Sequence, residues 1–253
     1  MLIWRYKPVG TQNFGDALND YLWPQLLHPN FASMPGTFYG IGTVLSDRLP
    51  PAEHHTVFGA GVGYHGVPTV DDKWRIYFVR GPHTAKYLGG CRYITDPGIL
   101  VQKFHSPSTG SPVFPCSFMP RWDSTSQELF EGCDKAGIHI IDPRWSVPQV
   151  IADIRDTELL LTEALHGAVV ADALRVPWIS IYGSRGHEFK WQDWCASMSM
   201  VWTPIDAEQF TLSWARDTAV PQLSARSVLA QRTHEMFEML DEFNYDLEAG
   251  DFA

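Results

Sequence analysis

The chain has 253 residues, of which 45% are hydrophobic and 19% are charged. This composition supplies enough apolar side chains for a full core and excludes a globally disordered or low-complexity chain. The length fits one large domain or two modest domains. The 29 acidic residues outnumber the 19 basic residues. Because no dense Lys/Arg stripe appears, the sequence argues against a nucleic-acid partner.

The four cysteines are scattered and form no C-x-x-C pair, which argues against a zinc ribbon or a dense disulfide framework. Four thiols are typical of a reducing compartment. The N-terminal apolar stretch is too short for a signal peptide, and no run of about 18 apolar residues could span a membrane. We therefore expect a cytoplasmic protein without a transmembrane segment, which could still work peripherally at the inner membrane.

Short β-branched or aromatic runs alternate with segments of helical character, which predicts an α/β fold with parallel sheets and crossover helices. The first part of the chain has predicted helices at 17–27 and 82–88 and predicted strands at 56–62, 75–79 and 92–95. The stretch 106–112 is rich in Ser, Pro and Gly, and it is therefore the best candidate for a linker.

A βαβαβαβ succession follows the linker. Its predicted strands are 113–119, 138–141, 158–162 and 178–182, and its predicted helices are 126–136, 147–154 and 164–174. Apolar residues then recur at helical spacing over 224–247, which predicts a long amphipathic C-terminal helix with a solvated acidic face. The pattern thus divides the chain into an N-terminal domain (1–105), a second domain (112–220) and a C-terminal helix with an acidic tail (221–253).

Two segments of the first domain are candidates for ligand contact. Asn13-Phe14-Gly15-Asp16 precedes a helix, where Asp16 either caps the free N–H groups or joins Asn13 in holding sugar hydroxyls. Gly61 belongs to a glycine-rich turn that either permits a tight bend or lets the backbone approach a ligand. No full G-x-G-x-x-G pattern supports a dinucleotide site.

Basic residues follow two predicted strands. Arg80 lies where a strand ends and a helix begins, so it either grips a carboxylate or phosphate or forms a surface ion pair. One later loop concentrates three possible cations, Arg185, His187 and Lys190, which suits a phosphorylated or carboxylated ligand. Trp191 and Trp194 either stack on a sugar or pack a short helix against the core.

The sharpest local pattern is Glu163-Ala164-Leu165-His166-Gly167, in which an apolar strand delivers a histidine to the first turn of a helix. A histidine can give or take a proton near neutral pH, and Gly167 would leave room for a substrate beside the ring. The alternative is a hydrogen-bonded histidine with a purely structural role.

Several short motifs occur in a defined order between about residues 11 and 195: NFGD (13–16), GIGTVL (40–45), VFGAGVG (57–63), VRG (79–81), TDPG (95–98), LHGA (165–168), VP (176–177) and FK (189–190). This series resembles the polysaccharide pyruvyl transferase family, and within it the exopolysaccharide ketal-pyruvate transferases. The resemblance implies two Rossmann-like domains facing a cleft, as in GT-B glycosyltransferases, followed here by the C-terminal amphipathic helix.

The resemblance also implies transfer of a pyruvyl group from phosphoenolpyruvate onto two hydroxyls of a sugar, giving a cyclic ketal and phosphate. Phosphoenolpyruvate would be the co-substrate, with no further cofactor and no metal, and the acceptor would be a sugar or lipid-linked oligosaccharide of an exopolysaccharide repeat. Protonated His166 matches the general acid, while Glu163 would orient it or serve a sugar hydroxyl. The donor's anionic groups would be held by cations, with Arg80, Arg185 and Lys190 as candidates.

One position departs from the family pattern, which commonly has Ser-Arg-x-His where this chain has Ala164 in place of the arginine. Either another cation, Arg185 or Arg121, grips the donor, or this subgroup handles the donor differently, or activity has been lost. Two other functions stay open. One is a GT-B glycosyltransferase, which would bind a nucleotide sugar. The other is a non-catalytic glycan-binding paralogue, which would bind saccharide without turning over any donor.

Overall fold

The computed structural model describes residues 1–183, 186–206 and 211–250, and it contains two parallel sheets. The first sheet has the strand order β1-β2-β3-β4, with β1 at Leu2–Ile3, β2 at Thr37–Tyr39, β3 at His55–Phe58 and β4 at Trp74–Phe78. The second has the order β6-β5-β7-β8-β9, with β6 at His139–Ile140, β5 at Ser117–Met119, β7 at Leu160–Thr162, β8 at Trp178–Tyr182 and β9 at Ile205–Asp206. All these strand pairs are parallel, which confirms the predicted α/β class.

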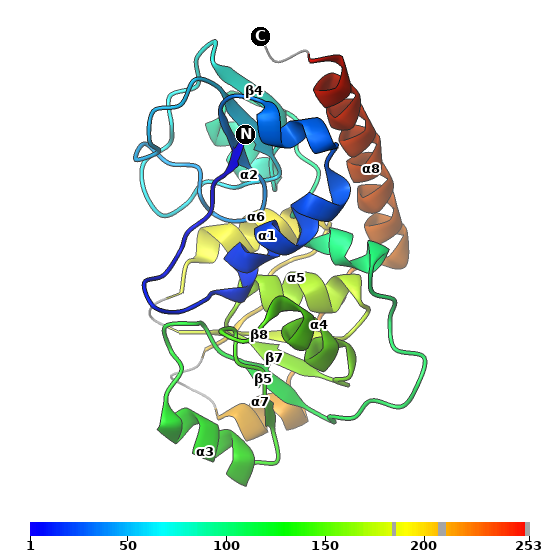
Figure 1. Cartoon of the computed structure of the whole chain (residues 1–253). Coiled ribbons are helices and arrows are strands. Elements are labelled where there is room, and N and C mark those ends of the chain that lie inside the picture. The colour runs from blue at the N-terminus through cyan, green and yellow to red at the C-terminus, as the bar shows by residue number, and fades with distance from the viewer. Residues whose placement is uncertain (184–185, 207–210, 251–253) are drawn as a thin grey trace.

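The helices cover and separate the two sheets, and α1, α5 and α6 lie between them (Figure 1). Their bounds are α1 Phe14–Leu26, α2 Pro82–Tyr87, α3 Gln127–Lys135, α4 Val147–Arg155, α5 Leu165–Ala173, α6 Glu188–Ser197, α7 Leu212–Thr218 and α8 Arg226–Ala249, with the 3-10 helices η1 at Pro29–Ser33 and η2 at Pro97–Lys103. Most predicted elements agree with these bounds within a few residues. The predicted strand at 92–95 is wrong, since Tyr93 makes only a single bridge to Val79.

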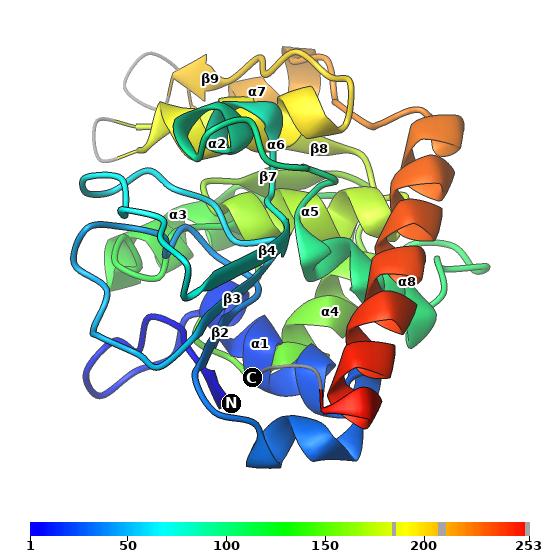
Figure 2. The same ribbon diagram turned by 90° about the horizontal axis from the view of Figure 1, so that it is seen from above.

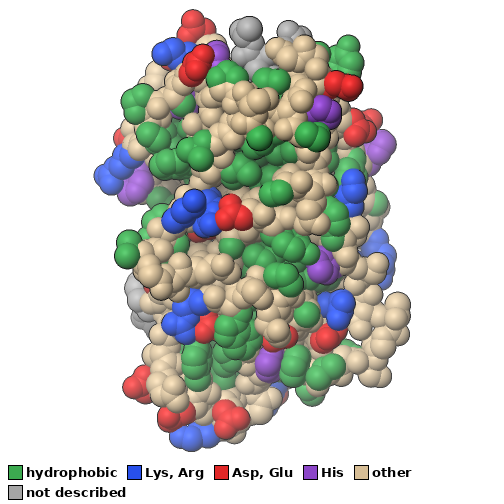
Figure 3. Space-filling model, viewed as in Figure 1, with side chains coloured by type: hydrophobic (Ala, Val, Ile, Leu, Met, Phe, Trp, Pro, Cys, Tyr) green, Lys and Arg blue, Asp and Glu red, His purple; other side chains and the backbone are tan. Residues whose placement is uncertain are grey.

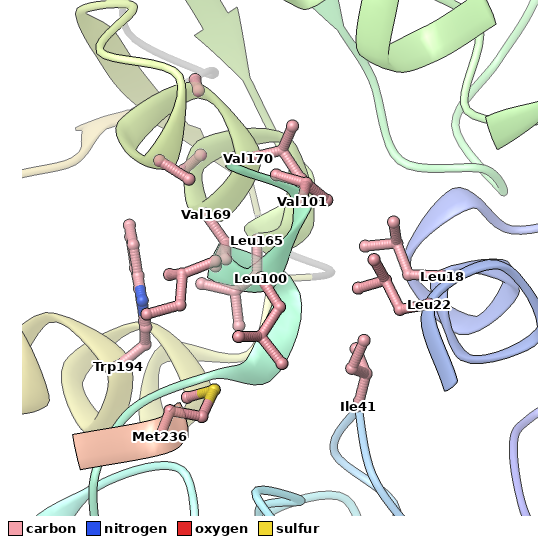
Figure 4. Close-up of a cluster of buried hydrophobic side chains, with 14 of the residues drawn as sticks. Leu18, Leu22, Ile41, Leu100, Val101, Leu165, Val169, Val170, Trp194 and Met236 are labelled. Atoms are coloured by element: carbon pink, nitrogen blue, oxygen red, sulfur yellow. The ribbon is translucent and has the colours of Figure 1, made fainter. Parts of the chain in front are cut away.

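The space between the sheets is filled by one apolar cluster, to which α1, η2 and α5 each contribute. Leu18 and Leu22 of α1 face Leu100 of η2 and Leu165 of α5, and all four side chains are buried (Figure 4). The residues Phe14, Leu18, Leu22 and Leu26 recur every four positions, so one face of α1 is continuously apolar. The two halves of the molecule therefore share a core.

A buried asparagine holds the start of α1 in place. The side-chain amide of Asn19 donates to the carbonyl oxygens of Asp16 (3.1 Å) and Ile41 (2.9 Å). Its oxygen accepts hydrogen bonds from the indole N–H of Trp23 (2.8 Å) and the backbone N–H of Ile41 (2.9 Å). Because every polar group of this fully buried side chain is paired, α1 is locked to the chain that follows β2.

The long helix α8 runs along one side of the molecule, from the second half back to the first (Figures 1 and 2). Phe243 of this helix is fully buried, and its ring lies 5.5 Å from Phe38, 5.4 Å from Phe58 and 5.0 Å from Tyr77. Within the described part of the chain, no helix combines the length and apolarity needed to cross a bilayer.

Replacing Phe243 with alanine should lower the free energy of unfolding by about 3–5 kcal/mol, because it leaves a cavity among aromatic rings. Urea denaturation would measure the loss. Tyr245→Ala is the matched control, since Tyr245 is 71% exposed on the same helix and should cost little. Equal losses in both variants would contradict this account of α8.

Candidate functional site

A cavity of about 800 Å³ lies between the two halves, and both contribute to its walls. The first half supplies β1 and the residues that follow it (2–7), residues 13–16 at the start of α1, and parts of the loops at 42–49 and 64–65. The second half supplies residues at 119–123 after β5, residues 164–166 at the start of α5, and Lys190 of α6. Parallel α/β sheets commonly bind ligands at the carboxyl ends of their strands, and β5 and β7 both end here.

His166 reaches this cavity from the first turn of α5, and its side chain is 15% exposed. The turn before it is shaped by Thr162, whose hydroxyl accepts from the Ala164 N–H at 3.0 Å and donates to the Met119 carbonyl at 3.2 Å. A Cβ at Gly167 would lie 2.6 Å from the Thr162 oxygen and 2.8 Å from the Met119 sulfur. Gly167 therefore lets α5 pack on the strand ends. It does not line the cavity, so the prediction that Gly167 leaves room for a substrate beside the ring is wrong.

Asp96 stands directly behind the imidazole. Its Oδ2 atom lies 3.3 Å from His166 Nε2, and its side chain is completely buried. The other oxygen, Oδ1, accepts from the Gly98 N–H at 2.9 Å and thereby caps η2. Burial alone would raise the pKa of Asp96, but His166, the Arg80 guanidinium and the Gly98 N–H together hold this pKa below its ordinary value. A carboxylate therefore faces Nε2.

Asp96 was not among the predicted site residues, although it belongs to the TDPG motif. The only local signal for Asp96 is that it precedes Pro97 at the end of an apolar segment. The same Asp-Pro pair is typical of an ordinary helix cap, so it does not indicate a functional site. Its second role depends on α5 packing against η2, and no local pattern encodes that contact.

The first turn of α1 lies against the other side of the imidazole. A Cβ at Gly15 would be only 2.0 Å from His166 Nδ1. Nε2 is buried against Asp96, whereas Nδ1 faces Gly15, so Nδ1 is our candidate for exchanging a proton with a ligand. The residues of the NFGD motif thus meet the histidine across the boundary between the two halves.

Asn13 and Asp16 both line the cavity, as their assignment to a sugar site requires. The expectation that Asp16 caps α1 is wrong, because Asn13 is the cap residue and Asp16 lies inside the first turn. The Asn13 amide donates to the Asp16 carboxylate. Burial raises the pKa of Asp16, although this hydrogen bond and the nearby charges of His166 and Arg5 act in the opposite direction.

Arg80 does not reach the cavity, because its side chain is completely buried. Its Nε donates to Asp193 Oδ2 at 3.2 Å, and Nη1 donates to the hydroxyl of Thr43 at 2.8 Å. Gly61 is needed beside it, since a Cβ there would lie 2.5 Å from Nη2. The predicted ligand contacts of Arg80 and Gly61 are therefore wrong: this arginine supports Asp96 from behind the site, and Gly61 makes space for it.

Glu163 does not orient His166. Its Oε2 accepts hydrogen bonds from the Arg121 backbone N–H at 3.0 Å and from the Ser124 hydroxyl at 2.5 Å, which anchors the loop after β5. Arg121 does line the cavity, but its guanidinium binds both carboxylate oxygens of Asp123, at 2.9 and 2.8 Å.

Lys190 lines the cavity as predicted, and its ammonium group donates to the Tyr64 hydroxyl at 3.0 Å. Arg185 falls outside the described residues. Trp191 and Trp194 are 1% and 0% exposed and pack near Trp178, so packing is their role and sugar stacking is excluded.

Three further cations line the cavity although no motif pointed to them: Arg5, Lys7 and Arg48. The first two follow β1, a strand of two residues that is too short to recognise by alternation. Asp16 and Asp123 are the acidic residues among the described lining residues, so the cavity is more basic than a chain of formal charge −10 would suggest. Over the face in Figure 3, Lys and Arg are interspersed with acidic and apolar side chains and form no broad basic patch.

Removing the Asp96 charge should make the free energy of unfolding vary less with pH in the acidic range. Because folding lowers the pKa of this carboxyl, its contribution to stability is present above its unfolded value of about 3.9 and is lost as the pH falls through the lower folded value. Asp96→Asn should therefore cost stability at pH 5, and its difference from the wild type should shrink toward pH 3. Urea unfolding at both pH values would test this, and a constant difference would count against it.

A methyl group at position 15 should displace the imidazole. Gly15→Ala should change the ring signals of His166 in NMR spectra and lower the melting temperature, because a contact of 2.0 Å must be relieved. Gly132→Ala is the control, since Gly132 lies in α3 with nothing within 4 Å of a built Cβ. Unchanged ring signals in Gly15→Ala would refute the contact.

The chain is similar to known proteins over most of its length. Residues 69–185 match the polysaccharide pyruvyl transferase family profile. The succinoglycan biosynthesis protein ExoV of Rhizobium meliloti (strain 1021) is 39% identical over 201 residues, which cover 76% of this chain and 63% of the relative. The aligned part is thus less than two thirds of that relative's length, and no solved structure matches the chain. The family profile and this relative show that the chain belongs to the polysaccharide pyruvyl transferase family.

Proposed function

We propose that this protein transfers a pyruvyl group from phosphoenolpyruvate to a sugar of an exopolysaccharide repeat, forming a cyclic ketal. The family and the relative named for succinoglycan biosynthesis support the class of reaction. One observation carries the proposal: His166, backed by the Asp96 carboxylate at 3.3 Å, opens into a cavity lined by cations from both halves.

Phosphoenolpyruvate has a carboxylate, a phosphate and a methylene carbon that must gain a proton. In the proposed reaction, His166 gives the proton from Nδ1 to that carbon, and positive charge develops at C2. One sugar hydroxyl bonds to C2 and loses its proton, and phosphate leaves with the electron pair of its C–O bond. A second hydroxyl then bonds to C2 and loses its proton, which closes the ketal. Of the two protons released by the hydroxyls, one is taken up by the departing phosphate and the other restores His166. Asp96 stabilises the imidazolium before transfer and holds the ring in place.

The donor's negative groups need cations in the cavity. Ala164 lines the wall where the family commonly has arginine, so the charge must come from other elements. Lys190 and the N-terminal cations Arg5 and Lys7 are placed to supply it. Asp16, whose raised pKa brings its protonation closer to neutral pH, is our candidate for accepting a proton from a sugar hydroxyl.

We also propose that residues 1–105 and 112–220 act as two Rossmann-like domains in a GT-B-like arrangement. The two parallel sheets and the cavity between them support this division. A cytoplasmic location is part of the same proposal, supported by four cysteines that are all free thiols.

His166→Ala should lower acceptor-dependent phosphate release from phosphoenolpyruvate by about 10²- to 10⁴-fold while the protein stays folded. Asp96→Asn should lower it less, because the histidine itself remains. His234→Ala is the control, since His234 is 76% exposed on α8. Turnover at the wild-type rate in His166→Ala would overturn the assignment.

A comparison of ligands by thermal shift separates this proposal from the two alternatives. Phosphoenolpyruvate should raise the melting temperature, because the native state alone binds it. Stabilisation by uridine or guanosine diphosphate instead would favour a nucleotide-sugar glycosyltransferase. Stabilisation by saccharides alone would favour a glycan-binding protein without donor chemistry.

A further inference from the structure

Two aromatic rings from opposite halves meet in the cavity wall. Tyr6 belongs to the segment after β1, and Trp122 belongs to the loop after β5. Their ring centroids are 6.1 Å apart and their planes are inclined by 47°. The rings touch at an angle, so neither covers the whole face of the other.

Both rings are accessible from the cavity. Tyr6 is 53% exposed, and Trp122 is partly exposed. Within the described residues, neither the Tyr6 hydroxyl nor the Trp122 indole N–H has a hydrogen-bond partner, although both rings line a cavity. An aromatic face beside a free polar group suits a ligand that offers both C–H surface and hydroxyls.

The loop that carries Trp122 is held firmly in its position. Glu163 accepts hydrogen bonds from the residues on either side of the tryptophan, from the backbone of Arg121 and from the hydroxyl of Ser124. A bidentate ion pair between Arg121 and Asp123 further constrains this loop. Glu163 therefore fixes the position of Trp122, and a fixed ring loses little freedom when a ligand binds.

The cavity is also larger than the proposed reaction centre requires. Its volume of about 800 Å³ is near the top of the range of about 300–1,000 Å³ found for sites that bury drug-sized ligands. A three-carbon phosphorylated acid and one sugar ring would leave part of this space unfilled. The remaining wall includes the aromatic pair.

We propose that Tyr6 and Trp122 form a binding subsite for a second sugar ring of the acceptor, beside the ring that receives pyruvate, and that Glu163 is its positioning residue. This inference rests on the proposed function, and it makes an oligosaccharide, and not a monosaccharide, the preferred acceptor. The apolar face of a pyranose stacks on the rings, and its hydroxyls pair with the free polar groups of Tyr6 and Trp122.

Calorimetric titration with glucose, galactose and their β-linked di- to tetrasaccharides would test the subsite in the full chain. The wild type should bind at least one oligosaccharide about tenfold more tightly than its monosaccharide, a gain equivalent to about 1.4 kcal/mol. Tyr6→Ala and Trp122→Ala should each lose most of this gain. Tyr245→Ala and Trp214→Ala are matched controls outside the cavity lining and should keep it.

Two variants of Glu163 distinguish positioning from general damage. Glu163→Ala should lose the gain, while Glu163→Gln should retain it, because an amide oxygen can still accept from Arg121 and Ser124. Phosphoenolpyruvate should still raise the melting temperature of all these variants, which also reports on their folding. Equal loss in the alanine and glutamine variants would remove Glu163 from the proposal.

The subsite is contradicted if the wild type gains nothing from a second sugar unit in this series, or if Tyr6→Ala and Trp122→Ala keep the gain. A loss of uridine diphosphate binding in place of oligosaccharide binding would assign the rings to a nucleotide base. The proposed function fails separately, if phosphoenolpyruvate does not stabilise the wild type.

Discussion

The site depends on a close contact between the two halves of the molecule, in which the imidazole of His166 lies against the α-carbon of Gly15. A single additional carbon at position 15 would come within 2.0 Å of Nδ1. The contact is maintained by the apolar cluster around α1, η2 and α5 and by the buried hydrogen bonds of Asn19. The position of the proposed acid is therefore a property of the interface core as well as of α5.

Electrostatics impose a second constraint, because Asp96 is buried and charged. A buried carboxylate is costly unless opposite charges and hydrogen-bond donors compensate for lost hydration. Here His166 lies in front of it, and Arg80 acts on it from behind, itself paired with Asp193. Arg80 thus helps to keep the pKa of Asp96 low, although its own side chain has no exposed surface.

The excess of acidic residues does not set the charge of the cavity. Seven of the acids follow Arg232, and none of the six that lie within the described residues lines the cavity. Exposed charges more than about 10 Å apart are largely screened at moderate salt. Among the charged residues that line the cavity, Arg5, Lys7, Arg48, Arg121 and Lys190 outnumber Asp16 and Asp123, although Arg5 is paired with Asp20 and Arg121 with Asp123.

The sequence alone determined the α/β class and most of the longer helices and strands. It also pointed to five residues that line the cavity: Asn13, Asp16, Arg121, His166 and Lys190. These features follow from local periodicity, from turn residues and from motifs at strand ends, which act over a few residues. The sequence did not predict that Arg80 is buried, that Glu163 anchors a loop or that Asp96 contacts His166. It also missed Arg5 and Lys7, which follow a strand of only two residues. Only the tertiary structure decided those roles, because each depends on packing between segments far apart in the chain, where contacts of about 3 Å determine whether a charge meets solvent, ligand or a buried partner.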